Sequence, residues 1–325
     1  MLVDPPLTVV SEEIPSEKDP ALGYVLAHIP PSPVAPHMVD GRYYARAERT
    51  RRVLQDGEVL QLHARRESVE EQVGRLLDTE IEREPVPALD RRLGHLYFVA
   101  QPIGAPSGLA RSITRGDRHT ATRLMWDTEP QFQSQAIRGG LRPDPRDAAS
   151  QSNRANGLGL SSHGLSGRGR TVLPNSNGGD NDDGTLLDIE LRDDGGIRLF
   201  VGRGTMSLGR TPAETAEFIL DSLAVAYTRR LVDWAVAVGE RTGWRGTWML
   251  GIHCDRLRGR SSFAHANNLG MFNAPAYDEN TYREVTTASH LEMQQRPNTV
   301  ARRVIGRLAE TLGTFGHYAR DLTEA

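Results

Sequence analysis

Apolar positions follow two spacings along this chain, and each spacing predicts a different element. Apolar runs bounded by proline or glycine indicate strands, and the predicted strands cover residues 7–10, 24–29, 42–46, 93–100, 186–191, 197–201 and 248–254. Apolar residues three or four positions apart indicate amphipathic helices, and the predicted helices cover residues 57–84, 211–242 and 300–315. Hairpins and long helices alternate in this pattern, which favours an α+β fold over a doubly wound parallel sheet.

Two local signals define the centre of the pattern. Residues 193–196, Asp-Asp-Gly-Gly, separate two apolar runs and therefore predict a β-hairpin. Residues 211–214 form a capping box with proline at the first helical position. We expect the long central helix to begin there and to end at Gly243.

The composition changes sharply between residues 140 and 185, where Gly, Ser, Asn, Asp and Arg dominate. Because so little apolar surface cannot offset the entropy of ordering the chain, we predict a flexible low-complexity insertion there. The chain then divides into four parts: a partial sheet-and-helix unit over 1–84, a connecting strand region over 85–139, the insertion over 140–185, and a C-terminal α+β domain with long helices over 186–325.

Charge and composition restrict the partners and the compartment. The formal net charge is −3, so an anion-binding surface must come from a local cluster. Arginine makes up 38 of the 39 basic residues, which fits either bidentate phosphate contacts or the codon usage of a GC-rich bacterial genome. A single cysteine, Cys254, excludes an internal disulfide and a multi-cysteine zinc site. With no signal segment or long apolar run, we expect a cytoplasmic protein without membrane contact.

Several motifs follow one another between residues 22 and 66. An apolar strand ends in Pro-Pro-Ser-Pro at 30–33, a Tyr-Tyr-x-Arg strand follows at 43–46, and a helix with an acidic start begins near Asp56 and Glu58. This segment resembles the C-terminal portion of the AlbA_2 domain of Schlafen-like proteins. The resemblance covers about 45 of the 325 residues.

The resemblance implies a partial AlbA_2-like sheet and helix, and an association with DNA or RNA in a regulatory or defence-associated protein. Family members are also described as ATP-binding, so the resemblance brings in ATP as a cofactor to be tested. The family's preceding segment, whose acids are associated with metal-dependent cleavage, has no counterpart here, and nuclease activity is not carried over. A sheet without its first strands also offers an edge for a partner strand or a second copy of the chain.

The strand predicted at 42–46 has a cationic face, because side chains of a strand alternate between its two sides. The net charge over residues 42–52 is +4, far from the average of the chain. Arginine contacts to phosphate and stacking on a tyrosine are the sequence-tolerant contacts of a nucleic-acid surface. The candidate nucleic-acid-binding residues are Arg42, Tyr44, Arg46, Arg49, Arg51 and Arg52. In the alternative interpretation these arginines form ordinary surface ion pairs with Glu67, Glu70 and Glu71 of the following helix.

A phosphate-binding loop is a weaker candidate. The only lysine, Lys18, lies between acids and without glycines, which excludes a Walker loop. Gly202, Arg203, Gly204 and Ser207 follow a predicted strand, where free amides could hold phosphate. An ordinary hairpin exit explains the same residues.

Metal-site signals are absent from the sequence. The ten histidines form no HxxxH or HExxH arrangement, and the acids at 180–183 and 193–194 lack the spacing of an EF-hand, so they are interpreted as solvated turn acids. His253 and Cys254 are neighbours on a predicted strand and point to opposite faces, and the cysteine is expected to be a small buried apolar residue.

Three functions follow from these patterns. The first is a nucleic-acid-binding protein without assigned catalysis. The second is a nuclease or a nucleotide-dependent component that needs residues absent from this chain. The third is a protein-interaction module whose sheet is completed by a strand from a partner.

Overall fold

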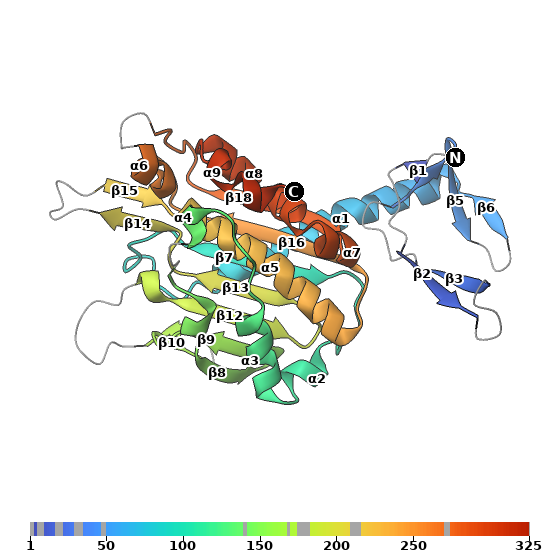
Figure 1. Cartoon of the computed structure of the whole chain (residues 1–325), viewed down its shortest axis with the longest axis horizontal. Helices are drawn as coiled ribbons and strands as arrows, with labels where there is room; N and C mark the ends of the chain where they lie inside the picture. The colour runs from blue at the N-terminus through green and yellow to red at the C-terminus, as the bar shows by residue number, and fades with distance from the viewer. Residues whose placement is uncertain are drawn as a thin grey trace.

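A seven-stranded antiparallel sheet forms the centre of the chain (Figure 1). The computed structural model describes residues 3–4, 10–16, 22–28, 35–46, 50–138, 142–167, 170–173, 183–208, 216–269 and 274–324. The strand order in the large sheet is β18 (Tyr282–Ser289), β16 (Thr247–Cys254), β7 (Leu96–Pro102), β13 (Ile197–Val201), β12 (Leu187–Arg192), β9 (Gly157–Ser161) and β8 (Ser150–Arg154). Together with the helices this makes an α+β fold, as predicted.

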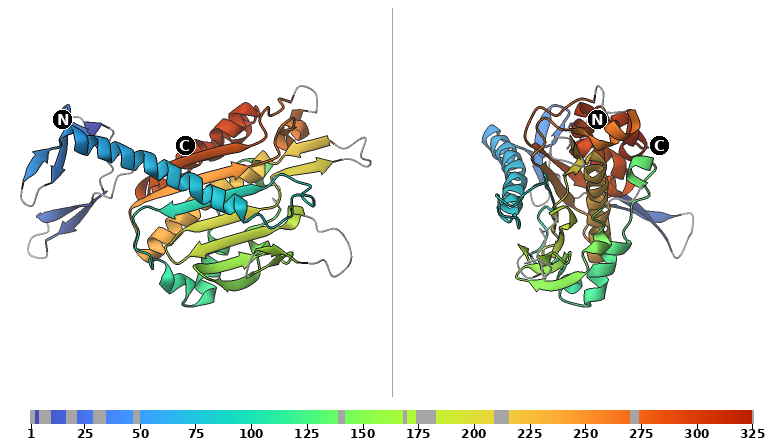
Figure 2. Two further views of the ribbon diagram at one scale, coloured as in Figure 1. Left: turned by 180° about the vertical axis from the view of Figure 1, so that it is seen from behind. Right: turned by 90° about the vertical axis from the view of Figure 1, so that its left-hand side faces the viewer.

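Helices lie on both sides of this sheet, with α1 (Asp56–Glu82) on one face and α5 (Asp221–Thr242) and α8 (Pro297–Thr311) on the other (Figure 2). The remaining helical segments are α2 (Arg111–Thr114), α3 (Arg118–Asp127), α4 (Gln135–Arg138), α6 (Phe263–Leu269), α7 (His290–Gln295), α9 (Phe315–Leu322) and the 3₁₀ turns η1 (Pro145–Asp147) and η2 (Asp183–Thr185).

The side-chain alternation of β7 shows how the two faces differ. Leu96 and Phe98 enter the main core with α5 and α8, whereas Val99 packs with Val73 and Leu77 of α1. All five side chains are essentially inaccessible to water. Burial of this apolar surface is the main force that holds the helices to the sheet.

Helix α1 begins and ends where the sequence predicts. A capping box joins Gln55 and Glu58 at its start, and Pro85 and Pro87 follow its end. Its C-terminal half packs on the sheet, where the Arg283 guanidinium of β18 lies 2.6 Å from the Asp78 carboxylate. Its N-terminal half projects beyond the sheet and carries the N-terminal strands (Figures 1 and 2).

Four small sheets complete the described structure. Near the N-terminus, β1 (Val3–Asp4), β4 (Met38–Val39), β5 (Arg42–Arg46) and β6 (Arg51–Val53) form one sheet, and β2 (Val10–Pro15) pairs with β3 (Gly23–His28). Elsewhere β10 (Leu165–Ser166) pairs with β11 (Thr171–Val172), and β15 (Ala216–Ile219) lies between β14 (Thr205–Leu208) and β17 (Ser261–Ser262).

The predicted flexible insertion over 140–185 is wrong for much of its length. Strands β8 and β9 lie inside it and form one edge of the large sheet, and Leu158 and Leu160 are buried in the main core. Two leucines are enough to hold β9 in the sheet, because its backbone pairs with β12 through hydrogen bonds. Glycines alternate with the two leucines along the strand. Residues 174–182 lie outside the described residues.

The predicted division into four parts also fails, because one sheet combines strands from 96–102 to 282–289. The boundary after residue 84 cuts α1 from the sheet on which it packs. This arrangement depends on pairing between strands that are far apart in the sequence, and a local change in composition does not predict such pairing.

The predicted start of the central helix is wrong as well. Residues 216–219 form β15, and α5 begins at Asp221 instead of Thr211. Pairing of β15 with β14 and β17 overrides the helical spacing there. The predicted end is confirmed, because Gly243 has a φ of +74°, the left-handed conformation that glycine adopts without strain.

Candidate nucleic-acid interface

The candidate residues lie on a short hairpin made of β5 and β6, here called the arginine ribbon. Arg46 is paired with Arg51, Ala45 with Arg52, and Tyr44 with Val53. Directly paired residues of antiparallel strands share a face. One face therefore carries Tyr44, Arg46 and Arg51, and the opposite face carries Ala45 and Arg52.

The second of these faces is turned toward α1. Tyr43 makes an edge-on contact with His63 of the helix, with 6.3 Å between ring centroids. Arg52 donates two hydrogen bonds to the Glu58 carboxylate, at 2.6 and 2.5 Å, and these bonds lower the pKa of Glu58 to about 2. The first turn of α1 thus neutralises Arg52 and fixes the orientation of the ribbon.

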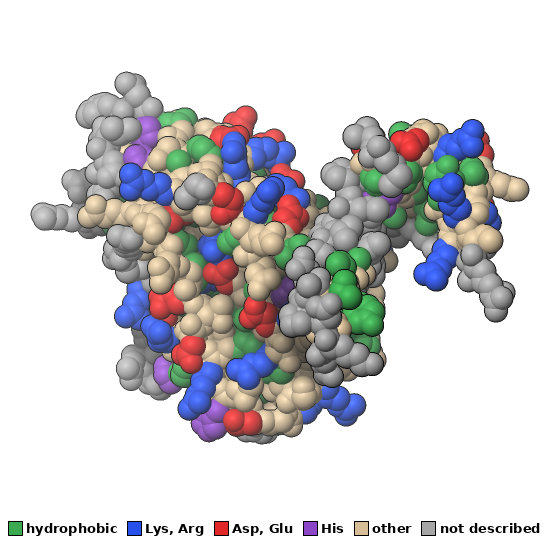
Figure 3. Space-filling view, turned by 45° about the vertical axis from the view of Figure 1, so that its right-hand side comes forward, with side chains coloured by type: hydrophobic (Ala, Val, Ile, Leu, Met, Phe, Trp, Pro, Cys, Tyr) green, Lys and Arg blue, Asp and Glu red, His purple; other side chains and the backbone are tan. Residues whose placement is uncertain are grey.

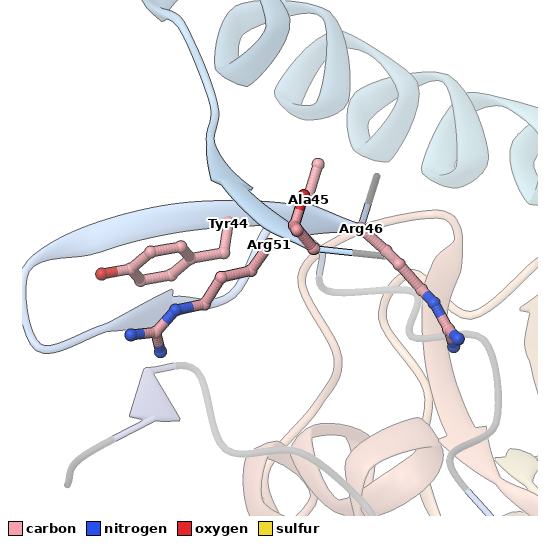
Figure 4. A pocket seen from close by; sticks show the side chains of 5 residues that line it. Tyr44, Ala45, Arg46 and Arg51 are labelled. Carbon is pink, nitrogen blue, oxygen red and sulfur yellow. The ribbon is translucent and has the colours of Figure 1, made fainter. Parts of the chain in front are cut away.

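The first face points away from the helix, as Figure 4 shows for Tyr44, Arg46 and Arg51. The Arg51 guanidinium lies over the Tyr44 ring, 5.4 Å from its centroid. An open pocket of about 490 Å³ adjoins them, and Tyr44, Ala45, Arg46, Thr50 and Arg51 line it. In the space-filling view, basic side chains gather on this outer end of the molecule, whereas basic and acidic side chains intermingle over the main body (Figure 3).

The cations of this face have no acidic partners in the described part of the chain. Arg42 and Arg46 are exposed, and neither they nor Arg51 form an ion pair with a described residue. Two like charges paired directly across strands, as in Arg46 and Arg51, destabilise a hairpin unless an anion lies between them. The arrangement therefore favours an anionic ligand.

The structure divides the six predicted residues. Arg42, Tyr44, Arg46 and Arg51 share the outer face, and we call these four the arginine–tyrosine face. Arg52 is on the other side. Arg49 lies outside the described residues.

The alternative interpretation of these arginines as surface ion pairs has limited support among the acids of α1. Glu71 lies 3.8 Å from Arg75 of the same helix. The side chains of Glu67 and Glu70 lie outside the described residues. The acid that does reach the ribbon is Glu58, which the sequence interpretation had used only as a helix-start signal.

The candidate phosphate loop has its amides in use. The Gly202 amide donates to the Leu186 carbonyl at 2.9 Å, and the Gly204 amide donates to the Gly94 carbonyl at 2.6 Å. Gly202 is so close to Asp183 that an added Cβ would lie 2.0 Å from a backbone oxygen. Arg203 is partly buried, Ser207 is exposed on β14, and this strand follows the loop directly. The helix start predicted at Thr211 lies outside the described residues.

Sequence reasoning missed a group of charged side chains inside the molecule, here called the interior charge cluster. It joins the C-terminal half of α1 to the sheet through paired arginines and acids at 2.5 to 3.9 Å. Its members are Glu80, Arg83, Arg154, Arg170, Asp188, Glu190 and Arg198. The signal for it was the alternation of acids at 188 and 190 with leucine and isoleucine in β12, which predicts a charged face.

A second cluster surrounds His95, which is fully buried beneath the end of α1. Its Nδ1 lies 2.9 Å from Glu84 and its Nε2 lies 3.4 Å from Asp183, and Tyr97 donates to Glu84. Burial lowers the pKa of His95, but the hydrogen bonds to Asp183 and Glu84 outweigh it and raise the pKa above its ordinary value. Both ring nitrogens face carboxylates, and this arrangement stabilises the protonated ring, in which both nitrogens are donors.

Asp183 corrects the prediction of a solvated turn acid at that position. Its side chain is buried and accepts hydrogen bonds from the Arg92 and Leu93 amides, at 2.9 and 3.0 Å. It therefore ties the segment before β12 to the segment before β7. Asp193, in the β12–β13 turn, pairs with Arg115 at 3.0 Å.

Cys254 has the buried position that was predicted. It is 1% exposed, lies in the main core, and its pKa is raised well above the ordinary value by burial. His253 projects from the other face toward Tyr97. Among the described residues, no three His, Cys, Asp or Glu side chains are grouped as metal ligands.

Comparison of the chain with models of known protein families, with curated proteins and with solved structures found no match. The AlbA_2 resemblance therefore stays a prediction. Over the described ranges, the structure contains no helix with the length and apolar character needed to cross a membrane.

Proposed function

We propose that this chain binds nucleic acid through the arginine–tyrosine face. The observation that carries the proposal is the side-by-side projection of Arg46 and Arg51, unpaired with described acids, beside an exposed pocket. Such a surface binds polyanions through phosphate contacts, and the ring of Tyr44 adds a surface on which bases stack. Helix α1 supports the proposal because Glu58 holds Arg52 on the far side, which orients the remaining cations outward.

The test compares the wild-type chain with the triple variant Arg42→Ala/Arg46→Ala/Arg51→Ala. Fluorescence anisotropy of labelled mixed-sequence DNA and RNA is measured over a salt series. Each lost phosphate contact reduces the slope of log K against log salt by about 0.7 to 0.9. We expect the triple variant to bind more weakly to both polymers and to lose a slope of roughly 1.5 to 3, which corresponds to two or three phosphate contacts.

A second triple variant serves as the matched control, since it removes the same charge elsewhere. Arg123, Arg241 and Arg320 are exposed on α3, α5 and α9. Their replacement by alanine should leave affinity and salt slope close to wild type. Equal losses in the two triple variants would show that net charge, and not the arginine–tyrosine face, governs binding, and the proposal would fail.

The partner-strand alternative has one observation in its favour. Strand β3 exposes apolar side chains on both faces, with Tyr24, Val25 and Leu26 at 74%, 69% and 55% exposure. Isolated two-stranded ribbons of this kind are marginally stable in water. The partner strand, the nuclease and the ATP-dependent function all stay predictions.

A further inference from the structure

The pocket on the arginine ribbon combines a flat surface with cations at its rim. Its walls include the Tyr44 ring, the Arg51 guanidinium above that ring and the Arg46 side chain. Its volume of about 490 Å³ falls within the roughly 300–1,000 Å³ range of ligand pockets. Both the phenol ring and the guanidinium are planar groups on which a nucleobase stacks.

Stacking of a base on this wall restricts the form of the nucleic acid. In a duplex, the faces of each base are covered by neighbouring bases, and their pairing edges are occupied. A duplex can therefore contact the arginine ribbon only through its phosphates. A single strand can turn a base into the pocket while Arg46, opposite Arg51 across the hairpin, contacts the adjoining phosphate.

We infer that the pocket accepts an unpaired base, and that the chain prefers single-stranded nucleic acid to duplex. This inference rests on the proposed function of the arginine–tyrosine face. It assigns separate roles within that face: Tyr44 and Arg51 hold the base, and Arg42 and Arg46 contact the backbone.

The experiment uses the full chain and a pair of probes of identical sequence. One probe is a labelled single strand of about 12 nucleotides, within the roughly 4 to 16 nucleotides that single-strand-binding folds cover. The other is the same strand annealed to its complement. Anisotropy gives the affinity for each probe in the wild-type chain and in the variants Tyr44→Ala, Tyr44→Phe and Arg42→Ala.

The wild-type chain should bind the single strand more tightly. Tyr44→Ala should weaken single-strand binding by about 5- to 150-fold, which is the ~1–3 kcal/mol measured for stacking of one base, and should change duplex binding less than about twofold. Tyr44→Phe keeps the ring and should retain the preference. Arg42→Ala should weaken both probes alike, because it removes a phosphate contact.

Four results would overturn the inference, and they separate it from the proposed function. If the wild-type chain binds both probes with equal affinity, or if Tyr44→Ala weakens binding of both probes equally, the chain still binds nucleic acid but the base pocket is refuted. Loss of the preference in Tyr44→Phe shows that the hydroxyl, and not stacking, is responsible. If the wild-type chain binds neither probe, the proposed function itself is wrong, and the inference of a base pocket is wrong as well. Far-UV circular dichroism confirms that each variant is folded.

Discussion

Replacement of Asp188 by asparagine tests whether the interior charge cluster stabilises the fold. The Asp188 carboxylate accepts two hydrogen bonds from Arg154, at 2.5 and 2.8 Å, one from Arg170 at 2.7 Å and one from Ser161 at 2.7 Å. None of these side chains is more than 6% exposed. Burial raises the pKa of Asp188, but the charge of Arg170 and the bonds from Arg154 outweigh it and lower the pKa below its usual range.

Asparagine keeps the shape of the side chain and removes its charge. The two buried guanidinium groups of Arg154 and Arg170 then share the remaining acids, Glu80 and Glu190, with Arg83. Removal of one partner from a buried ion pair costs about 3–5 kcal/mol, because the other charge stays buried without compensation. Since a domain is stable by only about 5–15 kcal/mol, Asp188→Asn should lose roughly a fifth or more of the stability of the chain.

Urea unfolding followed by circular dichroism measures this loss. The matched control is Glu310→Gln, which also removes one acid from an arginine pair. Arg302 and Glu310 lie 3.3 Å apart but are about half exposed. Solvent-exposed pairs contribute about 0–1 kcal/mol, so the control should unfold close to wild type. If Asp188→Asn lost no more stability than Glu310→Gln, the reasoning about buried charge would be refuted.

Two further predictions concern buried titratable groups. Because the pKa of His95 is raised in the folded state, its stabilisation is complete below the unfolded histidine pKa of about 6.5 and is lost as pH rises through the folded pKa. The unfolding free energy should therefore fall more steeply from about pH 6 to about pH 9 in wild type than in His95→Gln, and parallel curves would contradict this. Cys254 should react with Ellman's reagent only after unfolding in urea, because its thiol is buried and its pKa is raised; rapid labelling of the folded chain would count against this burial.

Local patterns predicted the elements that depend on local chemistry. The strands at 24–28, 42–46 and 248–254 and the hairpin of β12 and β13 are present, because each has an apolar run between turn residues. The strand alternation also separated Tyr44 from Tyr43 correctly, since the faces of a strand follow from period two alone. Arg52 was grouped with the other arginines of the segment, but it lies on the opposite face of the hairpin. There it forms an ion pair with Glu58, six residues away in the first turn of α1.

The features that sequence reasoning missed depend on long-range pairing. β8 and β9 look too polar for a core, yet they complete an existing sheet whose neighbour, β12, supplies the hydrogen bonds. The capping box at 211–214 resembles a helix start, but the adjoining residues pair as β15, and the helix begins one element later. The partners of Glu80 and Arg170 lie on strands far apart in the sequence, so no spacing rule brings them together.

Helix α1 acts as a lever between the two ends of the molecule. Its 27 residues extend about 40 Å, since each adds 1.5 Å along the axis. Glu80 and Arg83 connect one end of the helix to the interior charge cluster, and the arginine ribbon contacts the other end. A tilt of about 10° at the sheet end would move the opposite end of the helix by roughly 7 Å, which is more than the height of one helical turn. The direction in which the ribbon meets its ligand thus depends on ion pairs roughly five to seven turns away on the same helix, together with the packing of Val73 and Leu77 on the sheet.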